Sequence, residues 1–318
     1  MKTSRLKLVL AFGAIYLIWG STFLAIRFAI ETIPPFFMVG TRYLIAGSVL
    51  YAFARLTGAP PPERFHWKGA VVVGGLLLTL GNGGVVWAEQ LVASGLAALL
   101  VSTEPLWVVV FDSLRTGERP SGQVAAGLVL GILGMAFLLD PAEMGTGGRV
   151  AWPGVLAILC ASLSWALGSV YSRTARLPAS AALATAMQML AGGASLVLLG
   201  FATGEPARLD LSSITLRSIL AVAYLAVFGS LIGLTAFVWL LRVTTPARVS
   251  THAFVNPIVA VFLGWLFASE PITGRMLVAG GLVVVAVVAI TTGKRRAAER
   301  RVEPELTPAA VTNGCAEP

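Results

Sequence analysis

Residues 102–110, STEPLWVVV, place a carboxylate directly before a proline inside an otherwise apolar stretch. An unpaired charge at the centre of a hydrocarbon layer costs at least about 2.5 kcal/mol, so Glu104 is expected to face the protein interior. There it could contact an ammonium group of a ligand or bind and release a proton. The alternative is a structural ion pair with Arg42, whose position lies at a similar depth in the second apolar run.

Further polar side chains interrupt the apolar runs and could also contact a ligand. Arg42 could bind a carboxylate bidentately, or its guanidinium could extend to the lipid headgroups. Asn82, in GNGG, and Gln188 carry amides that could reach a ligand or bridge two helices. His252 is a candidate proton acceptor, although a histidine inside a helix is often satisfied by a neighbouring residue.

Tryptophans and prolines recur at matching places in the two halves of the chain. Trp19 and Trp165 lie well inside their apolar runs and could stack on a planar or apolar ligand. Pro105 and Pro257 each remove a backbone donor from an apolar run, which frees a carbonyl four residues earlier and could create a hinge. Simple packing is the alternative explanation for both prolines.

The sequence gives no indication of a metal site or a cofactor. Only two histidines and two cysteines are present, without a Cys/His cluster or a CxxC motif, so we expect no metal. No phosphate-binding glycine motif of the Walker type occurs, which argues against nucleotide hydrolysis. An intramembrane enzyme is disfavoured because His252 has no serine or cysteine at a spacing suited to a nucleophile.

The elements that must position these residues are membrane helices. The chain has 318 residues, of which 57% are apolar and 12% charged, and its mean hydropathy is +0.84. A soluble domain has about 25% charged residues. Runs of about 20 apolar residues, the length that crosses a bilayer, predict an all-α integral membrane protein with ten transmembrane helices, at residues 8–30, 36–56, 68–88, 94–113, 122–139, 152–173, 181–202, 215–240, 246–267 and 273–292.

The basic residues predict the orientation of these helices. The net charge is +8, but Lys and Arg lie in the short gaps between apolar runs, which argues against nucleic acid as a partner. Most of them fall on one side of the membrane if both termini are cytoplasmic. We therefore expect a multi-pass membrane protein with cytoplasmic N- and C-termini. Residues 293–318 are expected to form a disordered cytoplasmic tail.

A weak internal repeat divides the chain into two halves, at residues 1–140 and 150–292. A constant offset aligns Gly81 with Gly233 and Pro105 with Pro257, and it places Asn256 opposite Glu104 as a further candidate for ligand binding. Five helices per half is an odd number, so the halves must enter the membrane from opposite faces. Inverted repeats of this kind are typical of secondary transporters, whose substrate site lies between the repeats.

Several motifs, in this order along the chain, resemble the EamA family of the drug/metabolite transporter superfamily. They are IWGSTFLAIRFAIETIPPFFMVGTRYLIAG, GNGGVVWAEQ, the Glu-Pro pair at 104–105, GERP, AYLAVFGSLIG, FVNPIVAVFLGW and SEP at 269–271. The resemblance implies ten helices in two EamA repeats, alternating access and export of small metabolites or drugs from the bacterial cytoplasm.

These observations predict a secondary-active transporter that exports amino acids, their derivatives or drugs across the bacterial inner membrane. Its expected partners are a small-molecule substrate and the lipid bilayer, and it is expected to be a monomer or a homodimer. The alternative is a membrane sensor or assembly scaffold that transports nothing.

Overall fold

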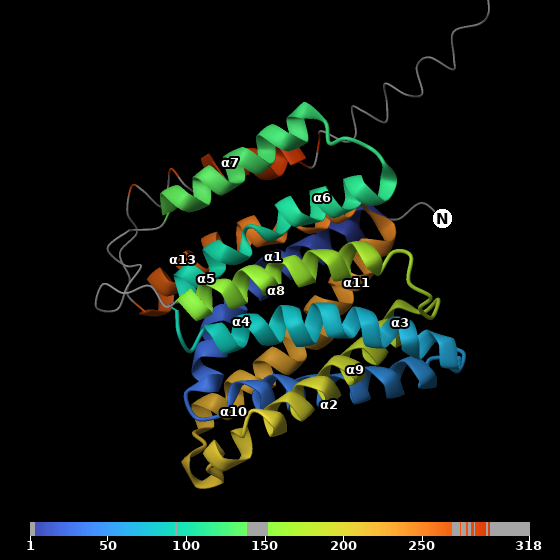
Figure 1. Cartoon of the computed structure of the whole chain (residues 1–318), viewed down its shortest axis with the longest axis vertical. Coiled ribbons are helices and arrows are strands. Elements are labelled where there is room, and N and C mark those ends of the chain that lie inside the picture. The colour runs from blue at the N-terminus through green and yellow to red at the C-terminus, as the bar shows by residue number, and fades with distance from the viewer. Residues whose placement is uncertain are drawn as a thin grey trace, which may run out of the picture.

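All of the secondary structure described for this chain is helical. The computed structural model describes residues 4–92, 94–138, 152–268, 274, 278, 281–282, 284–290 and 292. Its helices lie alongside one another in a bundle (Figure 1). The predicted all-α class is therefore confirmed for the described residues, while the predicted tail at 293–318 lies outside them.

Among the described residues, six helices are long and apolar enough to cross a membrane. They are α1 (Arg5–Ile30), α2 (Pro35–Leu56), the continuous helix Arg64–Ala88, α8 (Trp152–Tyr171), α9 (Ala181–Ala202) and the continuous helix Leu216–Val243. Two of the six contain a π-helical segment. Arg64–Ala88 consists of α3 (Arg64–Gly74), η1 (Gly75–Asn82) and α4 (Gly83–Ala88), and Leu216–Val243 consists of α10 (Leu216–Tyr224), η5 (Leu225–Leu234) and α11 (Thr235–Val243). The molecule is a multi-pass membrane protein.

Two further predicted spans are each broken into two helices. Residues 94–116 form α5 (Ser94–Val101) and α6 (Glu104–Thr116), and residues 246–268 form α12 (Pro246–Val249) and α13 (His252–Ala268). Pro105 lies in the first turn of α6, where its missing N–H disrupts no hydrogen bond. Pro105 therefore helps to begin α6, and its role as a hinge stays a prediction. Pro257 lies inside α13.

The remaining predicted spans are shorter or only partly described. The fifth corresponds to α7 (Gly122–Leu138). The predicted span at 273–292 lies only partly within the described residues, and those that are described there are helical.

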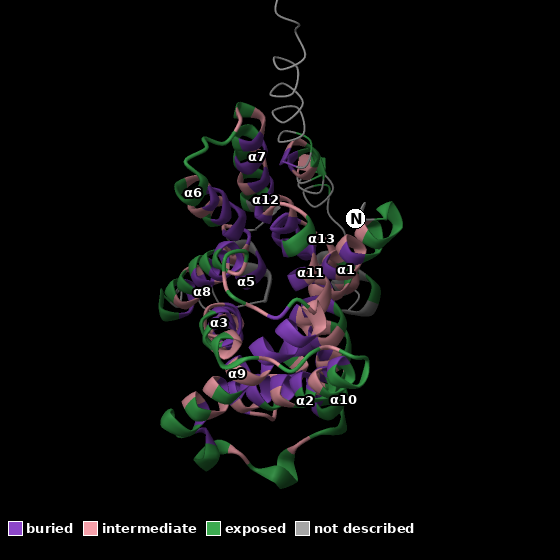
Figure 2. Cartoon of the chain, turned by 90° about the vertical axis from the view of Figure 1, so that its right-hand side faces the viewer, coloured by how far each residue is buried: buried purple, intermediate pink, exposed green. Residues whose placement is uncertain are grey.

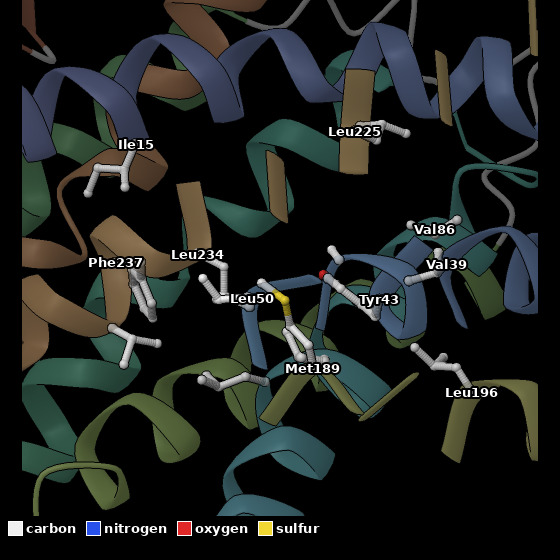
Figure 3. Close-up of a cluster of buried hydrophobic side chains, with 14 of the residues drawn as sticks. Ile15, Val39, Tyr43, Leu50, Val86, Met189, Leu196, Leu225, Leu234 and Phe237 are labelled. Atoms are coloured by element: carbon white, nitrogen blue, oxygen red, sulfur yellow. The ribbon is translucent and has the colours of Figure 1, made fainter. Parts of the chain in front are cut away.

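Small residues bring α2 and α9 into close contact. A Cβ added to Gly40 would lie 2.7 Å from Val197 Cγ2 and 2.9 Å from Val197 N, so only glycine fits there. Around this contact the main hydrophobic cluster gathers side chains from both halves of the chain, including Tyr43, Met189 and Phe237 (Figure 3). Buried residues face the centre of the bundle and exposed ones its outside (Figure 2). Many of the exposed residues are large and apolar, as expected of surfaces that contact lipid.

A buried carboxylate holds the beginning of α2. Glu205, in the short 3-10 helix η3 (Glu205–Arg208), is fully buried. Its two carboxylate oxygens accept hydrogen bonds from the backbone N–H groups of Phe36 and Phe37, at 3.0 and 2.8 Å. These N–H groups belong to the first turn of a helix, which has no intrahelical partners for them. The connection between α9 and α10 thus caps a helix of the other half of the chain.

Candidate functional site

A cavity of about 100 Å³ lies between the two halves of the chain. Helices α1, α2, α5 and α6 and the η1–α4 segment line it from the first half, and α8, η5 and α13 line it from the second. It brings together seven residues singled out from the sequence: Trp19, Arg42, Asn82, Glu104, Trp165, His252 and Asn256. The cavity therefore collects polar side chains whose positions in the sequence lie far apart.

Glu104 and His252 are the first residues of the two half-helices α6 and α13, and they face each other. His252 Nε2 lies 3.8 Å from Glu104 Oε2, and the two side chains are only 5% and 2% exposed. His252 Nδ1 lies 3.0 Å from the Val249 carbonyl oxygen, which can only accept, so Nδ1 carries a hydrogen. In a neutral ring Nε2 is then an acceptor that faces a carboxylate. The arrangement is electrostatically favourable when one proton is shared, with either Glu104 or Nε2 protonated.

Arg42 is bound to Asn82 rather than to Glu104. Its Nη2 donates a hydrogen bond of 2.9 Å to Asn82 Oδ1, and its guanidinium carbon lies 4.6 Å from the centre of the Tyr43 ring. The alternative of a structural Glu104–Arg42 ion pair is wrong for this conformation. Arg42 is 3% exposed, so it does not extend to the headgroups either. Within the described structure, Arg42 Nε and both carboxylate oxygens of Glu104 are buried without a hydrogen-bond partner.

Four rings form an aromatic wall beside the polar residues. Trp19 meets Trp165 edge to face at 5.5 Å between ring centres and lies 4.9 Å from His252. Phe237 packs against both tryptophans, at 5.1 and 5.4 Å. Phe237 was not identified from the sequence, because one phenylalanine in an apolar helix carries no distinguishing pattern.

Each tryptophan packs on a glycine of the other half of the chain. A Cβ added to Gly81 would lie 2.9 Å from Trp165 Cε3, and one added to Gly233 would lie 3.0 Å from Trp19 Cδ1. The two glycines lie in the π-helical segments η1 and η5, and such segments occur frequently at functional sites. The residues that the internal repeat aligned, Gly81 with Gly233 and Trp19 with Trp165, therefore make the same contact twice.

The two broken helices are joined at their interruptions. Ser102 Oγ, in the gap between α5 and α6, lies 2.9 Å from the carbonyl oxygen of Ala98 and 3.0 Å from that of Ala253, and its one hydrogen is shared between these two acceptors. The Ala253 carbonyl lies four residues before Pro257, which has no N–H to offer it. The carbonyl freed by Pro257 thus lies within reach of a donor from the other half of the chain.

Asn256 lines the cavity, whereas Gln188 does not. With its amide nitrogen facing the nearby carbonyls, Asn256 donates to His252 O at 3.0 Å and Tyr16 O at 3.2 Å, and so links α13 to α1 at the edge of the cavity. Gln188 lies on α9, fully buried, and does not line the cavity. Its backbone carbonyl is close to Gly74, the last residue of α3.

The profile of the EamA-like transporter family matches residues 6–140 and, a second time, residues 152–292. The chain is 40% identical over 289 residues to the uncharacterized inner membrane transporter YedA of Escherichia coli (strain K12), covering 89% of this chain and 90% of the relative. It is 28% identical to the uncharacterized transporter YvbV of Bacillus subtilis (strain 168), covering 92% and 93% of the two chains.

A solved crystal structure shares the fold. It covers 92% of this chain and 99% of its own chain, with a TM-score of 0.74 and 23% identity, a likeness that shows the fold alone. The resemblance to the EamA family that the sequence motifs carry is confirmed by the profile match and by the relative YedA. The chain belongs to the EamA-like transporter family.

Proposed function

We propose that this chain is a secondary-active transporter that moves a small zwitterionic solute, an amino acid or a derivative, out of the bacterial cytoplasm across the inner membrane. One observation carries the substrate class. The cavity contains a buried cation, Arg42, and a buried anion, Glu104, that are not paired with each other. Buried charges are costly unless compensated, and a zwitterion supplies both missing counter-charges.

The side chains suggest how such a solute would lie. Its carboxylate would bind Arg42, whose Nε and remaining N–H groups can form a bidentate pair. Its ammonium group would approach the carboxylate of Glu104, and its apolar part would rest against Trp19 and Trp165. A cavity of about 100 Å³ is much smaller than the roughly 300–1,000 Å³ typical of sites for drug-sized ligands. The volume therefore favours small metabolites over drugs.

The broken helices support alternating access as the mechanism. Discontinuous helices that meet near the middle of the membrane are common in secondary transporters. Here α6 and α13 begin at the cavity and are joined through Ser102 and Ala253. In the proposed cycle, the units 1–140 and 150–292 are inverted five-helix repeats that rock about this junction, with both termini in the cytoplasm.

A proton shared by Glu104 and His252 could couple export to the proton gradient. A substrate ammonium group and this proton compete for the same carboxylate, so each one leaves when the other binds. Within the described structure, other ionisable groups near the pair are Arg42 and Tyr43 on α2, which line the same cavity, and Tyr16 on α1. The Tyr16 hydroxyl is hydrogen-bonded at 2.6 Å to Thr251 beside His252. This competition predicts exchange of substrate for proton.

Counterflow into liposomes tests the proposal. The purified chain would be reconstituted and tested with labelled amino acids, nucleobases and cationic dyes. Wild type is expected to accumulate an amino acid or derivative and to exchange it for protons. Glu104→Gln should reduce the uptake rate at least about tenfold, the effect of losing one charge-assisted contact of roughly 1.5–3 kcal/mol. The matched control is Glu118→Gln, an exposed carboxylate beyond the end of α6.

Two results would contradict the proposal. Full proton-driven transport by Glu104→Gln would remove Glu104 from substrate binding and coupling. Accumulation of cationic dyes but of no zwitterion would assign the cavity to another class of substrate. A melting curve equal to that of wild type would show that Glu104→Gln is folded.

A further inference from the structure

A second set of hollows lies on the outside of α1, away from the cavity. Two connected grooves, with volumes of about 470 and 520 Å³, run between α1, α10 and α13 and share Ser21, Tyr224 and Leu263. On α1 they are lined by Leu17, Ile18, Ser21, Leu24, Ala25 and Phe28, which form one face of the helix. The cavity uses a different face of α1. Figure 2 shows α1, α10 and α13 along one edge of the bundle.

The grooves have the length and the chemistry of a site for an acyl chain. From Leu17 to Phe28 the helix rises roughly 16 Å, about half of the 30 Å hydrocarbon layer. The walls are almost entirely apolar, and the hydroxyls of Ser21 and Tyr224 are hydrogen-bonded to each other at 2.6 Å. Leu17, Leu220 and Phe262 are 63%, 60% and 51% exposed, so the grooves open towards the lipid.

Two opposite charges stand at one end of the grooves. The guanidinium of Arg217, near the beginning of α10, lies 3.5 Å above the ring of Phe28 and 3.7 Å from the carboxylate of Glu31, which follows the end of α1. The side chains are 57% and 42% exposed, so both can contact a molecule outside the protein. Helix ends of this kind lie at the level of the lipid headgroups.

We propose that this groove binds a phospholipid with an ethanolamine headgroup, in the leaflet on the side of the α1–α2 loop. Arg217 binds the phosphate, Glu31 binds the primary ammonium, and one acyl chain fills the groove as far as Leu17. A glycerol headgroup leaves the lipid with a net negative charge and offers Glu31 no cation. A choline headgroup carries no N–H to donate. The site does not depend on which solute the cavity takes.

Native mass spectrometry of the purified full-length chain tests this site. The protein would be delipidated and titrated with ethanolamine, glycerol and choline phospholipids that carry identical acyl chains. Wild type is expected to bind the ethanolamine lipid at least about fivefold more tightly than the other two lipids. This is the gain in affinity expected from one additional charge contact near a membrane surface.

Variants assign each part of the lipid to its contact. Arg217→Gln should weaken all three lipids, because all carry the phosphate. Glu31→Gln should abolish only the preference for ethanolamine and strengthen the glycerol lipid. Leu220→Trp should exclude the acyl chain from the groove. Arg208→Gln, an exposed arginine on the preceding connection, should change nothing.

The proposal is overturned if the three lipids bind wild type equally, or if the ethanolamine preference survives in Glu31→Gln. A dimer that Leu220→Trp dissociates, with no lipid retained by wild type, would instead identify the groove as an interface between two copies of the chain.

Discussion

At the scale of single residues, two buried carboxylates differ in their surroundings. Glu205 accepts two backbone hydrogen bonds at the beginning of α2. Glu104 accepts none within the described structure and faces His252 across the cavity. The first arrangement stabilises a fold, whereas the second leaves a charge available to a ligand. The sequence points to Glu104 because this residue interrupts an apolar run. The same Glu-Pro pair at 205–206 lies in a polar connection, where nothing in the sequence indicates that Glu205 caps α2.

Removing the Glu205 carboxylate should destabilise the protein without altering the cavity. Glu205→Ala leaves two N–H groups of α2 without their acceptor, which should lower the free energy of unfolding by about 2–4 kcal/mol. Thermal unfolding in detergent would measure the loss. The matched control is Arg208→Gln, an exposed residue of the same short helix, which should change stability by less than about 0.5 kcal/mol.

Replacing Arg42 by lysine tests whether its fork geometry binds a carboxylate. Lysine keeps the positive charge but cannot form two parallel hydrogen bonds. We expect Arg42→Lys to raise the half-saturating substrate concentration about tenfold, the equivalent of roughly 1.4 kcal/mol. Arg55→Lys, at the exposed end of the same helix, is the control. An unchanged concentration dependence in Arg42→Lys would place the substrate carboxylate elsewhere.

At the scale of elements, hydrophobicity predicted where helices run but not where they stop. The described spans follow the predicted ones closely, because each needs about 20 apolar residues. The breaks at Ser102–Thr103 and Ser250–Thr251 were missed, since two small polar residues barely alter the local hydropathy. The π-helical segments leave no pattern in one sequence. Six of the seven residues predicted to contact substrate line the cavity, and the seventh, Gln188, is buried outside it. The six could be predicted because charges, amides and tryptophans stand out inside apolar runs.

The contacts between tryptophan and glycine predict a matched pair of variants. Gly233→Ala and Gly81→Ala each place a methyl group against a rigid indole ring, which must then move into the cavity. Each should slow counterflow at least about tenfold, because overpacking costs roughly 1–3 kcal/mol and shifts the site. A change in tryptophan fluorescence should accompany the slower counterflow in both variants. Gly13→Ala, where a Cβ would meet no atom within 4 Å, should behave as wild type.

At the scale of the whole molecule, the cavity depends on both halves, which line it with buried and half-buried residues. A carrier must expose this cavity to each side of the membrane in turn, whereas a sensor or scaffold has no reason to do so. The sequence carries no direct sign of this distinction, because an internal repeat shows that two halves exist and says nothing of how they move.

Thiol labelling distinguishes the two behaviours. Cysteines would be introduced singly as Asn82→Cys, Glu104→Cys and Asn256→Cys in a chain with Cys160→Ser and Cys315→Ser. A carrier predicts labelling at Asn82→Cys and Asn256→Cys by membrane-impermeant reagents from either side, with substrate protecting both positions. If reagents from neither side label these cysteines, with or without amino acids present, the result would favour the scaffold.

The pairing of Glu104 with His252 also matters while the protein is being made. The two residues are separated by roughly 150 positions, and ribosomes add about 5–20 residues per second. Glu104 is therefore synthesised about 7–30 s before the imidazole that will face it. During this interval the carboxylate needs water, a proton or the insertion machinery as a temporary partner. Synthesis that pauses between the two halves should make this chain a substrate of membrane quality-control proteases.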